Sequence, residues 1–260
     1  MQRTVLLTGA TSGLGRYLAT ELAATGARVL VHGRDQVKVD ALAAELNSGG
    51  ASARGFVADL TSLSEVRRLA AAVAEQEPAL NTLVNNAGVG SGMAHQLTAE
   101  GHELHFAVNY LAPYVLTRAL LPTLRANEPA RIVNVGSLGQ ASLDFTDLDM
   151  ANRYEGSTAY ARSKLALAMF TFDLADELSD SSVTAVCLHP ATYMDTTMVR
   201  EAGITPLNTV EHGGAATMRV ILDPTGTGVF YNEDKPAHAH RDAYDQQLRT
   251  RLHTTTEQLV

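Results

Sequence analysis

The sequence predicts an α/β fold, a doubly wound parallel sheet of about seven strands with helices on both faces. Three observations support this prediction. Short apolar runs rich in β-branched residues recur along the 260 residues, and helical patterns separate these runs. No internal repeat, low-complexity tract or Pro/Gly-rich linker divides the chain. Strands this short and apolar suit a parallel sheet that is covered on both faces. We therefore expect a single domain over residues 1–260.

Six runs are expected to be strands, in the order Val5–Leu7, Val29–Val31, Phe56–Val57, Leu83–Val84, Ile132–Val135 and Val183–Val186. Helical patterns lie between them. Leucines at every fourth position from Leu14 to Leu22 give the first helix one apolar face. Ser62 and Glu65 have capping-box spacing, which predicts that another helix begins there. The segment from about Ser163 to Leu178 has the same helical period.

Composition and charge exclude several classes of function. The chain is 45% hydrophobic and 18% charged with a net charge of −8, which is typical of a soluble globular protein. The lack of a basic tract argues against nucleic acid or an anionic membrane as a partner. Cys187 is the single cysteine, so an internal disulfide is impossible. No apolar run approaches the roughly 18–20 residues of a membrane-spanning helix and no secretory signal is evident, so we expect a cytoplasmic protein.

A glycine-rich segment follows the first expected strand. Gly9, Gly13 and Gly15 have G-x3-G-x-G spacing, which differs from the common G-x-G-x-x-G pattern. Glycines at a strand-to-helix turn let the backbone approach a pyrophosphate, which the helix N-terminus attracts. A glycine turn without a ligand can look similar, but the strand before it and the helix after it are the required context. We therefore predict a Rossmann-type dinucleotide site with backbone contacts from Gly9, Thr11, Ser12, Gly13, Leu14 and Gly15.

The end of the second expected strand favours NADP(H) over NAD(H). An NAD site usually has an acid about 20 residues after the turn, whereas an NADP site has an arginine for the 2′-phosphate. Here Gly33 and Arg34 occupy that place. Asp35 argues against this interpretation, unless its side chain caps the next helix.

Tyr160 and Lys164 are four residues apart and share one face of an expected helix. A phenol is a poor acid–base catalyst at neutral pH unless a nearby cation lowers its pKa, and the lysine supplies that cation. Ser137 follows the fifth expected strand and Asn85–Gly88 follows the fourth. Ligands in open α/β sheets bind beyond the carboxyl ends of the strands, so we expect these residues near the same crevice.

Together these segments resemble the short-chain dehydrogenase/reductase family. Its glycine turn is matched by Gly9, Gly13 and Gly15, its adenine-holding pair by Asp59 and Leu60, and its NNAG motif by Asn85–Gly88. Its catalytic positions are matched in order by Asn109, Ser137, Tyr160 and Lys164. The resemblance implies further cofactor contacts from Asn85, Ala87, Gly88, Tyr160, Lys164, Pro190, Thr192 and Thr196. Thr196 is the candidate for the contact to the nicotinamide carboxamide, with Thr197 as the alternative. The resemblance also implies a water held by Asn109 and a homodimer or homotetramer.

Within that family the chain is most similar to the retinol-dehydrogenase-like branch, through Asn109–Tyr114, Leu143–Leu148 and Gly228–Tyr231. That branch generally uses NADP(H), which agrees with the interpretation of Arg34. Two features depart from the pattern. The apolar N-terminal anchor of many animal members is missing, so a membrane habit is not implied. Ala191 stands where the family usually has glycine, which puts the loop over the nicotinamide in doubt.

The sequence thus predicts a carbonyl reductase or alcohol dehydrogenase with a substrate loop at about residues 190–214. Tyr193, Met194 and Met198 would give this loop an adaptable apolar lining, although methionines often serve only core packing. Phe145 and Tyr154 are expected nearby. A bulky, lipophilic ketone, aldehyde or secondary alcohol is the substrate we expect.

Three alternatives compete with this prediction. The first is a non-catalytic NADP(H) sensor, against which the retained Ser137, Tyr160 and Lys164 argue. The second is epimerisation or dehydration on the same fold, which no motif excludes. The third is a metal site at His102 and His105, near His95. These histidines lack a recognised ligand arrangement, so we expect no metal.

Overall fold

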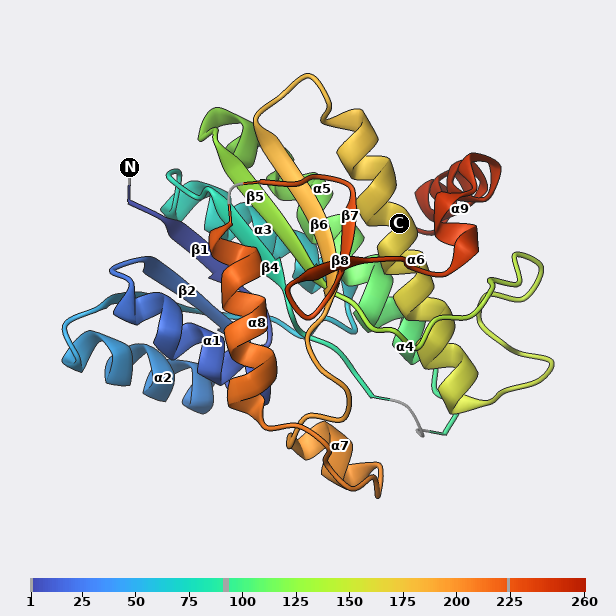
Figure 1. Ribbon diagram of the computed structural model, residues 1–260, viewed down its shortest axis with the longest axis horizontal. Helices are drawn as coiled ribbons and strands as arrows, with labels where there is room; N and C mark the ends of the chain where they lie inside the picture. The colour runs from blue at the N-terminus through green and yellow to red at the C-terminus, as the bar shows by residue number, and fades with distance from the viewer. Residues whose placement is uncertain (1, 91–93, 224) are drawn as a thin grey trace.

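The computed structural model describes residues 2–90, 94–223 and 225–260. Over these residues the chain forms one eight-stranded sheet in the order β3-β2-β1-β4-β5-β6-β7-β8 (Figure 1). The strands are β1 Thr4–Leu7, β2 Arg28–Gly33, β3 Ser52–Val57, β4 Thr82–Asn85, β5 Ala130–Val135, β6 Val183–His189, β7 Val229–Asn232 and β8 Lys235–Ala237. All six expected strands are present, and the single α/β sheet that the sequence predicted is confirmed.

The predicted count of about seven strands needs a small correction. The first seven strands pair in parallel, whereas β8 pairs antiparallel with β7 at the edge of the sheet. Only Glu233 and Asp234 separate the two strands, and Glu233 has a positive φ of 60°. A three-residue strand that contains Pro236 has little of the apolar pattern by which strands are recognised.

Helices fill the connections. They are α1 Gly13–Ala24, α2 Gln36–Ser48, α3 Leu63–Gln76, α4 Leu104–Phe106, the π-helical turn Ala107–Leu111, α5 Ala112–Ala126, α6 Gly156–Glu177, α7 Thr197–Glu201, α8 Val210–Leu222, the 3-10 turn Arg241–Tyr244 and α9 Gln246–Leu259. Ser62 caps α3, as its spacing predicts, but the Glu65 carboxylate accepts from the Asp59 N–H instead of closing the box. None of the helices described is long and apolar enough to cross a membrane.

Two apolar cores lie on opposite faces of the sheet. Val5 and Leu7 of β1 belong to the core under α1, α2 and α8, whereas Leu6 belongs to the core under α3, α5 and α6. Figure 1 shows α1, α2 and α8 in front of the sheet, with α9 packed beyond α6. Because β1 pairs with β2 on one side and with β4 on the other, the chain reverses its winding there. In open α/β sheets a ligand binds in a crevice at such a reversal, beyond the carboxyl ends of the strands. The corresponding place here, beyond the ends of β1 and β4, is called the crevice.

Candidate functional site

The glycine turn after β1 has the backbone that a dinucleotide site needs. Gly9 and Gly13 have positive φ angles of 64° and 48°, which only glycine adopts readily. A Cβ at Gly15 would lie 2.0 Å from the Gly9 carbonyl oxygen. Only glycine therefore lets the first turn of α1 pack directly against the glycine turn. Among the described residues the Ser12 side chain makes no capping hydrogen bond to α1. The Ser12 side chain therefore leaves the first N–H groups of this helix uncapped, and such groups can serve as phosphate donors.

Side chains from the neighbouring loop fix this turn. Thr8 Oγ1 accepts from the N–H groups of Asn86 and Ala87, both at 3.0 Å. Asn86 Nδ2 in return donates to the carbonyl oxygens of Thr8 and Gly9 at 2.8 and 3.2 Å. Asn85 instead turns into the sheet, where its Nδ2 donates to Thr117 and Asn134 side chains. Within this motif, Asn86 is the residue that supports the turn.

His32 is a further supporting residue that the motifs did not indicate. Its Nδ1 accepts from the Gly9 N–H at 3.3 Å, and its Nε2 lies 3.1 Å from the Ala58 carbonyl oxygen. Burial lowers the pKa of His32 to about 4, so the ring is neutral and its Nε2 carries the proton. The imidazole thus links the glycine turn to the end of β3, next to Asp59. A histidine inside an apolar strand gives no sequence signal for this role.

Arg34 lies exposed at the end of β2, beside the glycine turn. Gly33 allows this approach, because a Cβ there would lie 2.9 Å from Thr11 Cγ2. Asp35 caps α2 by accepting from the Lys38 N–H at 3.2 Å. The Asp35 carboxylate is therefore engaged in the helix cap, as one interpretation of the sequence expected.

Ser137, Tyr160 and Lys164 meet beyond the carboxyl end of β5. Lys164 Nζ donates to the Val135 carbonyl oxygen at 2.9 Å and lies 5.7 Å from the centroid of the Tyr160 ring. Burial lowers the pKa of Lys164 to about 8. Burial also raises the pKa of Tyr160, and the hydroxyl of Ser137 opposes this shift. Ser137 Oγ itself accepts from the Gly139 N–H at 3.0 Å.

Asn109 lies in the π-helical turn, where a wider helical turn often marks a functional site. Its Oδ1 accepts from the Val89 N–H at 2.9 Å, and its Nδ2 donates to the Val89 carbonyl oxygen and to Ser163 Oγ. A Cβ at Gly88 would lie 2.9 Å from Asn109 Oδ1 and 3.6 Å from Lys164 Nζ. The structure therefore brings all four expected catalytic residues to one region.

The loop after β6 crosses the crevice. Thr196 caps α7, and its Cγ2 would lie 3.1 Å from a Cβ on Gly13. Thr197 is exposed, so of the two candidates it is Thr196 that approaches the glycine turn. Met198 lies against the loop after β4, since its Cγ would be 2.5 Å from a Cβ on Gly90.

The first residues of the loop after β6 differ from one another in burial. Pro190 is buried, whereas Thr192 is exposed and lies 3.1 Å from His189 Nε2 through its Oγ1. Phe145, expected near the substrate, has the Arg251 guanidinium 4.6 Å over its ring. Asp144 and Asp147 accept from N–H groups of their own loop.

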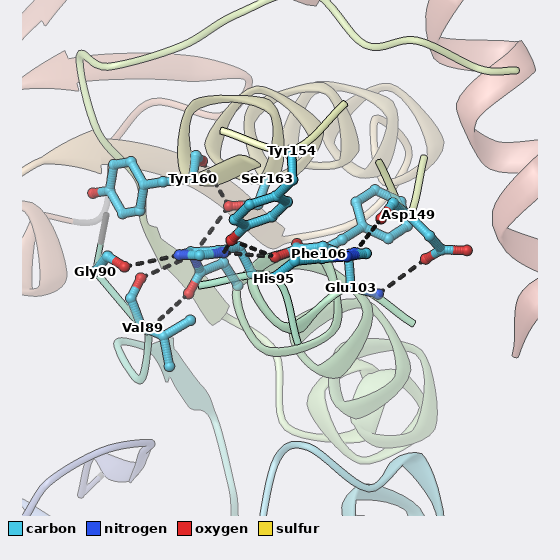
Figure 2. Close-up of polar contacts among 11 residues, drawn as sticks. Val89, Gly90, His95, Glu103, Phe106, Asp149, Tyr154, Tyr160 and Ser163 are labelled. Atoms are coloured by element: carbon cyan, nitrogen blue, oxygen red, sulfur yellow. Dashed lines mark hydrogen bonds and ion pairs between the residues drawn. The ribbon is translucent and has the colours of Figure 1, made fainter. Parts of the chain in front are cut away.

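Two of the three histidines considered as metal ligands, His95 and His105, make hydrogen bonds within the fold. His95 lies 2.8 Å from the Asp149 carbonyl oxygen, and His105 lies between Glu103 and Gly90 (Figure 2). In the part of the chain that the structure describes, no group of three His, Cys, Asp or Glu side chains could hold a metal ion. His105 contacts the Tyr160 ring edge-on at a centroid distance of 6.4 Å. The polar cluster around it was missed at the sequence level.

Comparison with known proteins agrees with this geometry. Residues 3–206 match the family model described as short chain dehydrogenase. Human retinol dehydrogenase 13 is 38% identical over 209 residues, which are 78% of this chain and 62% of the human protein. Mouse retinol dehydrogenase 14 is 40% identical over 202 residues, with 72% of this chain and 60% of the mouse protein covered. The chain thus spans about three fifths of the length of these relatives.

Two solved structures give the same result for the fold. The Pseudomonas aeruginosa RhlG/NADP active-site complex has a TM-score of 0.73 and 27% identity, over 88% of this chain and 94% of that one. A short chain dehydrogenase from Burkholderia cenocepacia in complex with NADP has a TM-score of 0.72 and 28% identity, over 88% and 95%.

Proposed function

Because the chain belongs to the short-chain dehydrogenase family, we propose that it is an NADP(H)-dependent oxidoreductase that interconverts a carbonyl compound and its alcohol. The observation that carries this proposal is the meeting of Ser137, Tyr160 and Lys164 beside the glycine turn. The family resemblance that the motifs indicated is confirmed by the family match and by the retinol dehydrogenases.

In the reductive direction each of these residues has a separate role. Ser137 and Tyr160 donate hydrogen bonds to the carbonyl oxygen and stabilise the negative charge that develops there. Bound NADPH supplies the hydride for the carbonyl carbon. Tyr160 delivers the proton to the oxygen through its phenol. Lys164, charged below its pKa of about 8, favours the phenolate that remains. Asn109 holds Val89 and Ser163 in place and is suited to hold a water beside the lysine.

The proposed preference for NADP(H) rests on Arg34. Its exposed guanidinium can bind a 2′-phosphate in a bidentate way. The Asp35 carboxylate caps α2. This hydrogen bond occupies the acid that would otherwise be available to bind the ribose hydroxyls of NAD(H). NADP in the two solved relatives supports the same choice.

The proposed substrate is bulky and lipophilic. Leu138, Tyr193 and Met198 have exposed fractions of 47%, 47% and 41%, and they follow β5 and β6 on the side of the crevice. Large apolar side chains exposed near a polar site commonly contact an apolar ligand. The names of the retinol dehydrogenases support this class of substrate. A homodimer or homotetramer stays a prediction from the resemblance.

The test measures the consumption of NADPH, and of NADH in parallel, with ketones and aldehydes from small to polycyclic. We expect NADPH to be consumed, and larger apolar carbonyls to be reduced faster. Tight NADPH binding without turnover of any carbonyl would favour the sensor. Product formation without net consumption of the cofactor would favour epimerisation or dehydration.

A further inference from the structure

A buried acid–imidazole pair lies directly behind the proposed active site. Glu103 and His105 are 1% and 0% exposed. The Glu103 Oε1 atom lies 2.7 Å from His105 Nδ1, and the opposite ring nitrogen, Nε2, lies 2.8 Å from the Gly90 carbonyl oxygen (Figure 2). The proposed catalytic scheme uses neither residue.

The hydrogen-bond partners determine the charge of this pair. A carboxylate and a backbone carbonyl are both acceptors, so each nitrogen of His105 has to donate and the ring carries two protons. Burial raises the pKa of Glu103, but hydrogen bonds from His105 and from the Phe106 N–H outweigh burial and lower it. The pair is therefore an imidazolium bound to a carboxylate. Among the described residues, the other ionisable groups facing it are the phenols of Tyr154 and Tyr160 and the Asp149 carboxylate, which accepts from the Glu103 N–H at 2.9 Å.

The pair joins three segments of the proposed active site. Through Gly90 it holds the loop after β4, whose neighbour Val89 is held by Asn109. Through Glu103 Oε2 it caps α4, which leads into the π-helical turn. Tyr154, just before α6, lies 3.4 Å through its hydroxyl from both Glu103 and His105.

The fourth contact is with the catalytic tyrosine itself. The rings of His105 and Tyr160 meet edge to face, with centroids 6.4 Å apart. The imidazole is bound by Gly90 through one ring nitrogen and by Glu103 through the other, and Figure 2 shows Gly90, Glu103 and Tyr160 around this cluster. The His105 ring thus supports the Tyr160 ring by direct contact.

We propose that Glu103 and His105 form a positioning pair for the proposed reaction, whose hydrogen bonds and ring contact hold the Tyr160 ring and the Gly88–Gly90 loop in register. This inference rests on the proposed function. A buried ion pair adds little to stability compared with apolar residues of the same size, so a role in geometry explains the pair better than a role in folding. Displacing a reacting group by about 1 Å can reduce a rate by about 100-fold.

The experiment compares two variants with a matched control. His105→Phe keeps an aromatic ring against Tyr160 but removes both hydrogen bonds. Glu103→Gln keeps the α4 cap and lets a neutral imidazole still donate to Gly90. The control is Glu77→Gln, because Glu77 is also a buried carboxylate in an ion pair, with Arg28, at the opposite end of the sheet. If unpaired Glu103 prevents His105→Phe from folding, the double variant with Glu103→Gln replaces it.

We expect His105→Phe to lower kcat about 10- to 100-fold while Kd for NADPH stays within about threefold of the wild type. Glu103→Gln should stay within about fivefold in kcat, and Glu77→Gln should lower only the melting temperature. Nitrogen NMR of the wild type at pH 7 should show two protonated ring nitrogens on His105, and Glu103→Gln should show one.

Three results would overturn the proposal: a loss of kcat below tenfold in His105→Phe, an equal loss of NADPH affinity, or a neutral His105 in the wild type. The proposed function is judged separately. A wild type that reduces no carbonyl overturns both proposals, whereas an inactive Tyr160→Phe beside a normal His105→Phe overturns the positioning pair alone.

Discussion

Replacing Lys164 with methionine removes the charge that lies beside Tyr160. The lysine Nζ is 5.7 Å from the centroid of the tyrosine ring. At an effective dielectric constant of about 20, one charge at this distance stabilises a phenolate by about 3 kcal/mol, or about two pKa units. Burial already raises the pKa of Tyr160, so the phenolate depends on this charge. We expect kcat for alcohol oxidation at pH 7 to fall about 100-fold.

The same variant should not lose stability. Burial lowers the pKa of Lys164 from 10.5 to about 8, so between these pH values the unfolded chain binds more protons and stability rises with pH. Below pH 8 the charged lysine therefore destabilises the native state, by at most about 3 kcal/mol. Removing it should leave the free energy of unfolding equal or higher at pH 7.

The assay combines a pH profile of kcat with denaturant unfolding, and Lys38→Met serves as the control. The Lys38 side chain is 68% exposed, so its replacement should change neither quantity. A kcat for Lys164→Met within fivefold of the wild type would refute the electrostatic reasoning. So would a loss of activity accompanied by an equal loss of folded protein.

Three further predictions follow from the cofactor crevice. Arg34→Ala should raise KM for NADPH about 10- to 100-fold, since charge-assisted bonds to phosphate are lost, and leave KM for NADH unchanged; equal shifts for both would contradict the assignment. Gly13→Ala should weaken NADPH binding at least about tenfold in calorimetry, because φ is 48° there and the new Cβ would approach Thr196 Cγ2 at 3.1 Å; an unchanged Kd would disprove this. Because the pKa of His32 is about 4 in the fold instead of 6.5, the free energy of unfolding should fall as the pH drops from 6.5 to 4. Replacement by Asn should reduce this dependence, with His189 contributing the remainder through its own lowered pKa of about 4, and an unaltered slope would show that His32 is not a source of it.

The sequence predicted the sheet well because its strands are short, apolar and regularly separated by helices. It missed the start of α6, which is Gly156 instead of a residue near Ser163. The first turns of α6 carry Tyr160 and face the site, so their residues are small or polar and lack an apolar period. The strand β8 was not predicted either, because its three residues are half-exposed or exposed and lack an apolar pattern.

The motifs indicated residues that the fold brings to one region, because each motif specifies single residues at fixed spacing; the roles of these residues stay predictions. No motif indicated the supporting residues. His32, Glu103 and His105 act through contacts between segments 15 to 26 residues apart or between elements that meet only in the fold. Burial and the chemistry of the facing atoms define their roles, and neither is visible in a spacing. The choice of Thr196 over Thr197 also needed the loop's path across Gly13.

The most direct test of the central claim compares the wild type with Tyr160→Phe, measuring NADPH consumption with a reducible carbonyl and, separately, Kd for NADPH. Phenylalanine keeps the ring that His105 contacts and removes only the hydroxyl that would deliver the proton. The account predicts a loss of kcat of at least about 1000-fold, toward the upper part of the range for general acid catalysis, with Kd for NADPH almost unchanged. Substantial turnover by Tyr160→Phe would contradict the assignment of Tyr160 as the proton donor.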